Sequence, residues 1–337
     1  MRHLNWGILA AGNIAGRFAK GLNATEEATA LAVGSRSLDK AKAFAADHGI
    51  PKAYGSYEQL LADPEVDAVY IATPNTLHAE WAIKAARAGK HILCEKPVTV
   101  DAPELDKVLA VVEECDVFFM EAFMYRCHPQ WKRLQEILDA DTIGEVRGLY
   151  STFAYNMGMD EKALANIRLT NPVAGGALMD VGCYCVSFSR LIAGEEPVAC
   201  KAVGHIGEGT RVDHQTTGVL QFPSGIVASF ACATQCAVPA IAQVFGSKGS
   251  VTVTTPWFPS DENATLVVNA GGKTETIEVK HGRDLYGNEA LTVAEHIDAR
   301  QAPRPAMSWD DSRGQMRTLD ALRANLGLKF DCEETEQ

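Results

Sequence analysis

Short apolar runs alternate with amphipathic segments over the first 120 residues of the chain. Apolar positions spaced near 3.6 residues predict helices over residues 14–22, 38–48, 78–88 and 103–115. Continuous apolar runs between them predict strands over residues 6–10, 30–33, 67–72, 91–94 and 117–120. Because strands that alternate with helices usually pair in parallel, this part of the chain predicts an α/β fold with a doubly wound parallel sheet.

The pattern changes after about residue 123. Helical spacing predicts helices over residues 130–138, 177–191, 290–300 and 309–325. Strands, several of them separated by short glycine-containing turns, are predicted over residues 146–156, 199–205, 216–222, 226–234, 240–245, 250–254 and 264–268. This mixture predicts an α+β domain with an open, mostly antiparallel sheet.

The length of the chain and this change of pattern suggest two domains. A chain of 337 residues is too long for one ordinary hydrophobic core. We assign residues 1–122 to the first domain and residues 123–330 to the second. The polar and largely acidic residues 331–337 predict a disordered tail.

Composition excludes some classes of partner. A net charge of −12 argues against nucleic acid or an anionic membrane surface as the main partner. The amino terminus has no apolar signal region, and no apolar run approaches the roughly 18–20 residues of a membrane span. Nine cysteines without the paired spacing of a zinc site predict free thiols, mostly buried, in a reducing cytoplasm and no metal centre.

The loop between the first predicted strand and helix, Ala10 to Ala15, is a variant of the G-x-G-x-x-G/A motif of dinucleotide-binding folds. Gly12 would let the backbone approach a pyrophosphate, and Ala15 would let the helix pack closely on the sheet. The free N–H groups of the helix start favour an anion. The predicted cofactor residues of this loop are Gly12, Asn13, Ile14 and Ala15. An ordinary tight turn between strand and helix is the alternative.

The end of the second predicted strand indicates which cofactor would bind. NAD sites usually carry an acidic residue there, about 20 residues after the loop, which binds the ribose 2′-hydroxyl. Here the chain reads Ser35-Arg36, with Lys40 one turn into the next helix. A hydroxyl and cations stand where a carboxylate would repel a 2′-phosphate, which favours NADP. A solvated Arg36 without a ligand is the alternative.

Two further strand ends carry polar residues. The segment after the third strand offers hydroxyl and amide groups to a cofactor, and its predicted cofactor residues are Thr73, Pro74, Asn75, Leu77 and His78. A capping role for this segment is equally compatible with the sequence. The next strand ends in Glu95-Lys96-Pro97, where the proline restricts the lysine's backbone at the edge where open α/β sheets bind ligands.

Asp180 and Tyr184 lie four residues apart in a predicted helix, so they share one face. A phenol accepts a proton near neutral pH only if nearby cations lower its pKa from the ordinary value of about 10. Lys96 is a candidate for that cation. Lys96, Asp180 and Tyr184 would together form a set for interconverting an alcohol and a carbonyl beside a nicotinamide. Ordinary packing and hydrogen bonding is the alternative for Asp180 and Tyr184.

Several motifs in one order resemble those of the Gfo/Idh/MocA oxidoreductases. They are the variant glycine loop, Pro74-Asn75 with His78, Glu95-Lys96-Pro97, the segment 120–129 and Gly175-Gly176 followed by Asp180 and Tyr184. Within this family, residues 50–58 and 182–185 resemble the dimeric dihydrodiol dehydrogenase and NADP-dependent D-xylose dehydrogenase branch. Inositol dehydrogenase relatives have a histidine where this chain has Tyr184, and Ala10 replaces the first glycine of the loop.

The resemblance implies a Rossmann domain and a second domain whose open sheet faces a partner subunit, and so a homodimer. It also implies a cis peptide bond before Pro97 and catalytic roles for Lys96, Asp180 and Tyr184. We further expect Glu95, Lys96 and Pro97 to contact the cofactor, and Arg126 to line its nicotinamide end.

The expected activity is reversible hydride transfer between NADP and a carbinol or carbonyl carbon of a sugar, polyol or cyclic diol. A keto-sugar or dicarbonyl reductase on the same scaffold is one alternative, and redox-assisted glycoside cleavage with a retained cofactor is a second. A non-catalytic NADP-sensing regulator is a third; the presence of Lys96 and Tyr184 disfavours it.

Overall fold

The computed structural model describes residues 2–333, which form two compact domains. The first contains the described residues up to 127 together with residues 282–313, and the second contains residues 128–281 together with the described residues from 314 onward. The predicted boundary at residue 122 and the unbroken second domain over 123–330 differ from this division. The chain returns because α9 (Leu285–His296) packs against α1 (Asn13–Asn23) of the first domain.

Two glycines permit this return. A Cβ atom on Gly21 would lie 2.6 Å from the backbone nitrogen of Gly287, so α1 and α9 approach more closely than other residues would allow at these positions. Such a crossing depends on residues more than 260 positions apart in the chain. The local pattern of apolar residues therefore could not place α9 in the first domain.

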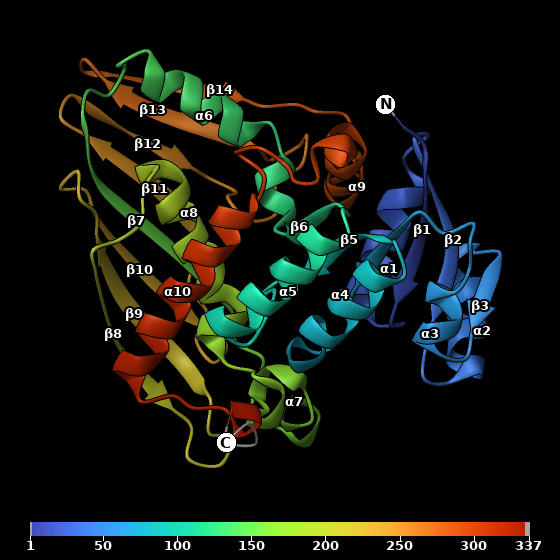
Figure 1. Cartoon of the computed structure of the whole chain (residues 1–337). Helices are drawn as coiled ribbons and strands as arrows, with labels where there is room; N and C mark the ends of the chain where they lie inside the picture. Colours follow the sequence, from blue (N-terminus) through green and yellow to red (C-terminus); the bar gives the residue numbers. More distant parts are fainter. Residues whose placement is uncertain (1, 334–337) are drawn as a thin grey trace. The chain divides into compact units, whose positions relative to one another are not determined.

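The first domain contains a six-stranded parallel sheet in the order β3-β2-β1-β4-β5-β6 (Figure 1). Its strands are β1 (Leu4–Leu9), β2 (Ala28–Gly34), β3 (Lys52–Tyr54), β4 (Ala68–Ile71), β5 (His91–Glu95) and β6 (Phe119–Ala122). Besides α1 and α9, its helices are α2 (Leu38–His48), α3 (Tyr57–Leu61), α4 (His78–Arg87) and α5 (Ala102–Glu114), with shorter 3-10 turns at Asn75–Leu77, Met124–Cys127 and Ile297–Ala299. The predicted doubly wound parallel sheet is confirmed. The strand order reverses between β1 and β4, where such sheets bind ligands.

The second domain contains an eight-stranded sheet in the order β14-β13-β12-β11-β7-β10-β9-β8. Its strands are β7 (Val146–Ala154), β8 (Ala199–Ile206), β9 (Asp213–Gln221), β10 (Val227–Ala233), β11 (Ile241–Gly246), β12 (Gly249–Val253), β13 (Thr265–Ala270) and β14 (Lys273–Glu278). Only β7 and β10 pair in parallel among these strands, so the predicted open, mostly antiparallel sheet is confirmed.

The helices of this region are α6 (Gln130–Asp139), α7 (Glu161–Leu164), α8 (Cys183–Ala193) and α10 (Trp309–Leu326). The second division between the domains falls inside α10, between residues 313 and 314. Short turns cover Ile167–Leu169, Asn171–Val173 and Asp331–Glu333, and a π-helical turn covers Leu178–Gly182. The stretch Asn171–Ala193 is long and apolar enough to cross a membrane by length and composition alone. However, 83% of its most apolar window is buried, as in a core helix of a globular domain.

One face of the second sheet packs against α8, and the other exposes apolar side chains. Leu149, Leu220 and Phe230 are buried on the packed face. On the other face, Tyr150 and Val219 lie on either side of Ser229 in register. The exposed apolar residues of these strands are Tyr150, Val203, Val219, Val227 and Phe245.

The predicted disordered tail, residues 331–337, is corrected in part. Asp331–Glu333 form a 3-10 turn in which Arg211 contacts the Asp331 carboxylate at 2.6 Å, and Arg323 contacts Glu333 at 2.9 Å. Acidic residues in this turn therefore pair with specific cations of the second domain. Residues 334–337 lie outside the described residues.

Candidate active site

The loop between β1 and α1 presents backbone N–H groups. Gly12 caps α1 without a side-chain hydrogen bond, and a Cβ atom at this position would contact nothing within 4 Å. The space beside Gly12 and the unpaired first turn of α1 suit an anionic group. Ala15 is fully buried where the helix meets the sheet, as the motif requires. Ala10, which replaces the first glycine, has a φ of 92°, a conformation that glycine adopts far more readily.

Cations follow the end of β2, as the sequence predicts. Arg36 and Lys40 are exposed, and Ser35 is buried, with its hydroxyl accepting from the backbone N–H of Ser37. Ser37 also caps α2 by accepting from the backbone N–H of Lys40. These two hydrogen bonds hold the backbone between the end of β2 and the first turn of α2. Arg36 and Lys40 therefore have defined backbone positions at this edge of the sheet.

The segment after β4 contains an unsatisfied polar atom. The Thr73 hydroxyl is buried and has no hydrogen-bond partner within residues 2–333. Buried polar atoms without partners are rare and usually have a functional reason. Thr73 therefore fits a role in binding a ligand at the carboxyl end of β4. Pro74, Asn75 and Leu77 surround it in a short 3-10 turn and remain partly accessible.

His78 links two loops rather than offering a nitrogen to a ligand. It is buried at the start of α4, and its ring nitrogens lie 2.8 Å and 2.9 Å from the carbonyl oxygens of Thr73 and Pro97. Burial lowers the pKa of His78. The imidazole thus joins the turn after β4 to the turn after β5, and its predicted contact with the cofactor stays a prediction.

The Lys96-Pro97 turn is held from both sides by acidic side chains. The peptide bond between these residues is cis, as the family resemblance implies. Glu95, itself bonded to the Tyr70 hydroxyl, accepts the backbone N–H of Lys96 at 3.2 Å. Glu121 accepts the backbone N–H of Val98 at 3.1 Å. Lys96 is half-buried, so its backbone is fixed while its side chain reaches the surface of the first domain.

Arg126 lies in the interior of the first domain. Its guanidinium is fully buried, donates to the carbonyl oxygen of Pro305, and lies 3.4 Å from the Asp311 carboxylate. All three residues belong to the first domain. Arg126 therefore donates to protein carbonyl and carboxylate groups within the first domain, and its predicted place at the nicotinamide end of the cofactor stays a prediction.

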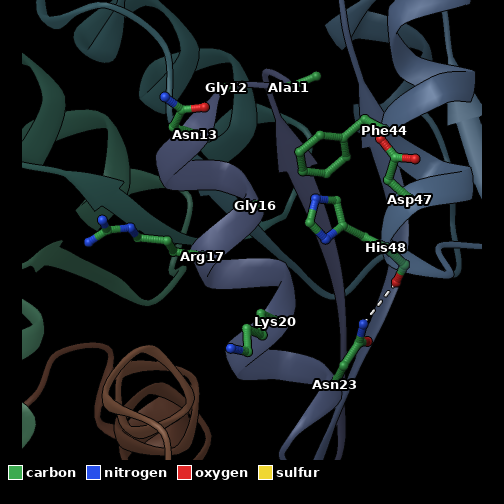
Figure 2. Close-up of a pocket in the computed structure, with 10 residues that line it drawn as sticks. All are labelled: Ala11, Gly12, Asn13, Gly16, Arg17, Lys20, Asn23, Phe44, Asp47 and His48. Atoms are coloured by element: carbon green, nitrogen blue, oxygen red, sulfur yellow. Dashed lines mark hydrogen bonds between the residues drawn. The ribbon is translucent and has the colours of Figure 1, made fainter.

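A cavity of about 650 Å³ opens between α1 and α2 (Figure 2). Gly12 and Asn13 lie at one end of it, and at the other Asn23 donates to the carbonyl oxygen of His48 at 2.8 Å. The remaining lining residues include charged groups of both signs; they are Ala11, Gly16, Arg17, Lys20, Phe44 and Asp47. Ser35, Arg36 and Thr73 are not among the lining residues, and the cavity extends along α1 and α2 from the Gly12 loop.

In the second domain, Asp180 and Tyr184 lie on one continuous helical segment. Asp180 is within the π-helical turn Leu178–Gly182, and Tyr184 is in the first turn of α8. Turns of this kind inside helices are often found at functional sites. The start of the segment is capped from another strand, because the Asp213 carboxylate accepts the backbone N–H of Leu178 at 2.8 Å. Burial raises the pKa of Asp213 to about 6.

Aromatic rings surround Tyr184. Its ring packs edge-on against Phe153 at 5.1 Å and against Trp257 at 5.8 Å, measured between ring centroids. Trp257 is fixed by donating its indole N–H to the carbonyl oxygen of Thr152 at 2.9 Å. The phenol of Tyr184 therefore has a ring position set by packing rather than by rotation in solvent.

Two residues that the sequence does not single out bind Asp180. The hydroxyl of Tyr155 donates to Oδ2 of Asp180 at 2.6 Å, and Nε of Arg168 donates to the same oxygen at 2.9 Å. Neither residue lies in a recognisable motif, and they precede Asp180 by 25 and 12 positions. No local signal could have identified them, since only the fold brings them to the helix.

The predicted site residues thus come from both domains. Lys96 lies in the first domain, and Asp180 and Tyr184 lie in the second. The combination of all three into one reacting centre stays a prediction. Within the first domain, three strand ends carry the expected polar groups. Within the second, Asp180 and Tyr184 lie four residues apart on one helical segment, which is π-helical at Asp180 and α-helical at Tyr184.

Comparison with known proteins gives the family. Residues 4–123 match the oxidoreductase family model GFO_IDH_MocA, described as an NAD-binding Rossmann fold, and residues 131–252 match the GFO/IDH/MocA C-terminal domain. A trans-1,2-dihydrobenzene-1,2-diol dehydrogenase of Mus musculus is 38% identical over 97% of this chain and 98% of its own length. A D-xylose 1-dehydrogenase (NADP(+)) of Haloferax volcanii is 38% identical over 88% of this chain and 89% of its own.

Solved structures agree with this assignment. A variant of a 3-ketoreductase from Actinomadura kijaniata, in complex with TDP-benzene and NADP, has a TM-score of 0.87 and 28% identity, covering 96% of this chain and 98% of that one. An aldose-aldose oxidoreductase from Caulobacter crescentus, complexed with glycerol, has a TM-score of 0.86 and 27% identity, covering 96% and 97%. With two family models matched in order and relatives similar over nearly its whole length, the chain belongs to the Gfo/Idh/MocA family of oxidoreductases.

Proposed function

We propose that this protein is an NADP-dependent oxidoreductase that moves hydride between NADP(H) and a carbinol or carbonyl carbon of a sugar, polyol or cyclic diol. The observation that carries the proposal is the helix that presents Asp180 and Tyr184 together, with a cation, Arg168, bonded to that aspartate. The similarity to dehydrogenases named for a dihydrodiol and for D-xylose supports this substrate class.

The first domain contains residues that fit NADP. The open space at Gly12 and the start of α1 would hold the pyrophosphate, and Thr73 would gain a partner for its buried hydroxyl. Arg36 and Lys40, with Ser35 beside them, would bind the 2′-phosphate through charge-assisted hydrogen bonds. The bound cofactor supplies the hydride acceptor or donor, and the turn at Lys96 stands on the same sheet edge.

The side chains of the protein would handle the proton. As the carbinol C–H bond gives up its hydride, Tyr184 would take the proton of the hydroxyl, and in the reverse direction it would return that proton to the carbonyl oxygen. Lys96 would favour the phenolate through its positive charge and polarise the substrate oxygen. Asp180 would accept a hydrogen bond from a substrate hydroxyl or orient Lys96.

A substrate panel tests the proposal directly. Purified protein is assayed with D-xylose, other aldoses, inositols and trans-dihydrodiols, each with NADP and with NAD, by absorbance of the reduced cofactor. The expected result is NADP-dependent oxidation of at least one vicinal diol or sugar. Absence of turnover with every substrate, combined with tight NADP binding, would support the nucleotide-sensing alternative.

Reduction of a keto-sugar is the second candidate, because the solved structure of a 3-ketoreductase covers nearly the whole chain. Assays in both directions with matched alcohol and carbonyl pairs separate the two. A carbonyl reduced with kcat/KM at least 10-fold above any alcohol oxidation would favour the reductase. Cofactor that survives dialysis would instead favour redox-assisted glycoside cleavage.

The exposed sheet face supports a further proposal, a cytoplasmic homodimer in which this face is covered by a second copy. Tyr150, Val203, Val219, Val227 and Phe245 are exposed on that face, and clustered exposed apolar residues often mark protein interfaces. Light scattering on wild type and on Val219→Asp measures the mass. A dimer that dissociates in the variant is expected, and a monomeric wild type would contradict the proposal.

A further inference from the structure

Arg168 and Tyr155 approach Asp180 from two separate segments. Tyr155 follows β7, and Arg168 lies in the 3-10 turn Ile167–Leu169. Both donate to the same carboxylate oxygen, at 2.6 Å and 2.9 Å. An ionised carboxylate oxygen is an acceptor only, and it can accept two such hydrogen bonds at once. These two contacts hold the orientation of Asp180 within the second domain itself.

The loop that carries Arg168 packs against the residues just before the helical segment that contains Asp180. The backbone N–H of Gly176 donates to the carbonyl oxygen of Arg168 at 2.8 Å. A Cβ atom on Gly175 would lie 2.5 Å from the carbonyl oxygen of Ile167 and 2.8 Å from that of Arg168. Gly175 therefore leaves the space that this loop occupies. The Gly175-Gly176 pair of the family motif has a physical reason, which is to let the Arg168 loop lie directly against the helix that carries Asp180.

Charge also connects Arg168 to the tyrosine. Asp180 is the main reason that the pKa of Arg168 is raised, and Tyr155 and Tyr184 act in the same direction against burial. The interaction is mutual, since a guanidinium that a phenolate stabilises also stabilises that phenolate. The pKa of Tyr155, in contrast, is raised by burial and by Asp180, so this phenol keeps its proton and acts as a donor.

The groups around the Tyr184 phenol come from several elements of the second domain. Arg168 contacts Asp180, which lies one turn earlier on the same helical segment, and Phe153 and Trp257 contribute apolar rings. Tyr155 stays beside Asp180 as a neutral donor. Arg168 is thus a cation of this domain that contacts Asp180 and interacts through its charge with Tyr184.

We propose that Arg168 and Tyr155 are positioning residues for the reaction: together they clamp the Asp180 carboxylate, and the guanidinium of Arg168 provides positive charge that favours the Tyr184 phenolate. This inference rests on the proposed function, in which Asp180 and Tyr184 contact the substrate. The clamp adds a second cation beside Lys96, which was the only cation predicted for this role from the sequence. A partly exposed ion pair contributes little to stability, so an effect on catalysis is distinguishable from an effect on folding.

The experiment compares Arg168→Met, Arg168→Lys and Tyr155→Phe with wild type in the direction of alcohol oxidation, using the best substrate of the panel. Lys162→Met is the matched control, because Lys162 is an exposed cation of the neighbouring helix α7 without a contact to Asp180. Thermal midpoints and NADP affinity are measured for each. Tyr184→Phe and Asp180→Asn are assayed beside them.

The clamp predicts that Arg168→Met lowers kcat about 10- to 100-fold at pH 7, the range of one charge-assisted hydrogen bond, with NADP affinity unchanged. The pH at half-maximal oxidation should rise, because a base without its cation deprotonates at higher pH. Arg168→Lys should recover part of both effects, and Tyr155→Phe should lower kcat about 3- to 10-fold.

Turnover and pH profile of Arg168→Met equal to those of Lys162→Met would overturn the clamp. A loss of the same size at every pH that lysine does not recover would also overturn it, since it would indicate a structural role only. If Tyr184→Phe and Asp180→Asn lose turnover while Arg168→Met does not, the clamp alone fails. Wild-type turnover in Tyr184→Phe and Asp180→Asn would remove the proposed function and the clamp together.

Discussion

In the first domain, the candidate residues follow directly from the ends of parallel strands: Gly12 after β1, Arg36 after β2 and Lys96 after β5. In the second domain, Asp180 depends on donors 12 and 25 residues earlier, and its helix is capped by Asp213, 35 residues after Leu178. The difference shows that a parallel α/β sheet places its site by connectivity, because every strand ends at the same edge. The second domain places its site by side-chain contacts between distant segments.

The largest expected effect concerns the tyrosine. Tyr184→Phe should lower kcat about 10²- to 10⁴-fold, the usual range for loss of a general acid or base, while NADP affinity stays near wild type. Steady-state kinetics and fluorescence titration of NADPH measure the two quantities. Lys162→Met, which changes an exposed residue of α7, is the control and should keep full turnover. Near-normal turnover in Tyr184→Phe would exclude the tyrosine as the base.

Asp213 tests the long-range cap of the second domain. The folded-state pKa of about 6 lies above the ordinary 3.8, so the folded state binds the proton more tightly than the unfolded state. Protonated Asp213 therefore contributes about 3 kcal/mol to the free energy of unfolding. This contribution is fully present below about pH 4 and is lost as the pH rises through 6.

Urea unfolding of wild type and Asp213→Asn at several pH values between 4 and 7 measures this contribution. The difference in unfolding free energy, wild type minus variant, should fall by about 3 kcal/mol from pH 4 to pH 7. Asp213→Asn is the control for wild type at each pH, because the two proteins share all other titrating groups. A difference that stays constant with pH would contradict the raised pKa.

Arg36 tests the strand-end placement of the first domain. Arg36→Ala should weaken NADPH binding about 10-fold or more and leave NADH binding within about 2-fold, because only NADPH carries the 2′-phosphate. Lys42→Ala, an exposed cation on the same helix as Lys40, is the matched control and should affect neither cofactor. Equal weakening of both cofactors would refute the 2′-phosphate role.

The smallest expected effect lies in the glycine loop. Ala10 has a φ of 92°, so Ala10→Gly should relieve strain and raise the unfolding free energy by up to about 1 kcal/mol. The adjacent Ala11 is outside the positive-φ region, so Ala11→Gly should instead lower stability by increasing the freedom of the unfolded chain. Thermal unfolding of both variants checks the comparison. If Ala10→Gly does not raise the unfolding free energy, the loop tolerates alanine at this position without cost.

Sequence patterns were sufficient where the physical rule is local. Period-two and 3.6-residue spacing predicted most strands and helices, but the edge strands β3 and β14 were missed. β3 has only three residues, and five of the six residues of β14 are exposed, so neither has the apolar alternation that marks a strand. The contacts of Arg126 with Pro305 and Asp311 were not predictable from the sequence, because these partners lie 179 and 185 residues later in the chain.

The parallel sheet, the strand-end positions of Gly12, Arg36 and Lys96, and the helical segment of Asp180 and Tyr184 were all predictable from local sequence. Each follows from neighbours within a few residues, where backbone geometry limits the possible structures. Three features depend on tertiary packing: α9 returns to the first domain, His78 and Glu121 hold the Lys96 turn, and Arg168 and Tyr155 hold Asp180. These contacts join segments that sequence spacing leaves unrelated, and packing of the folded chain alone brings their atoms within hydrogen-bond distance.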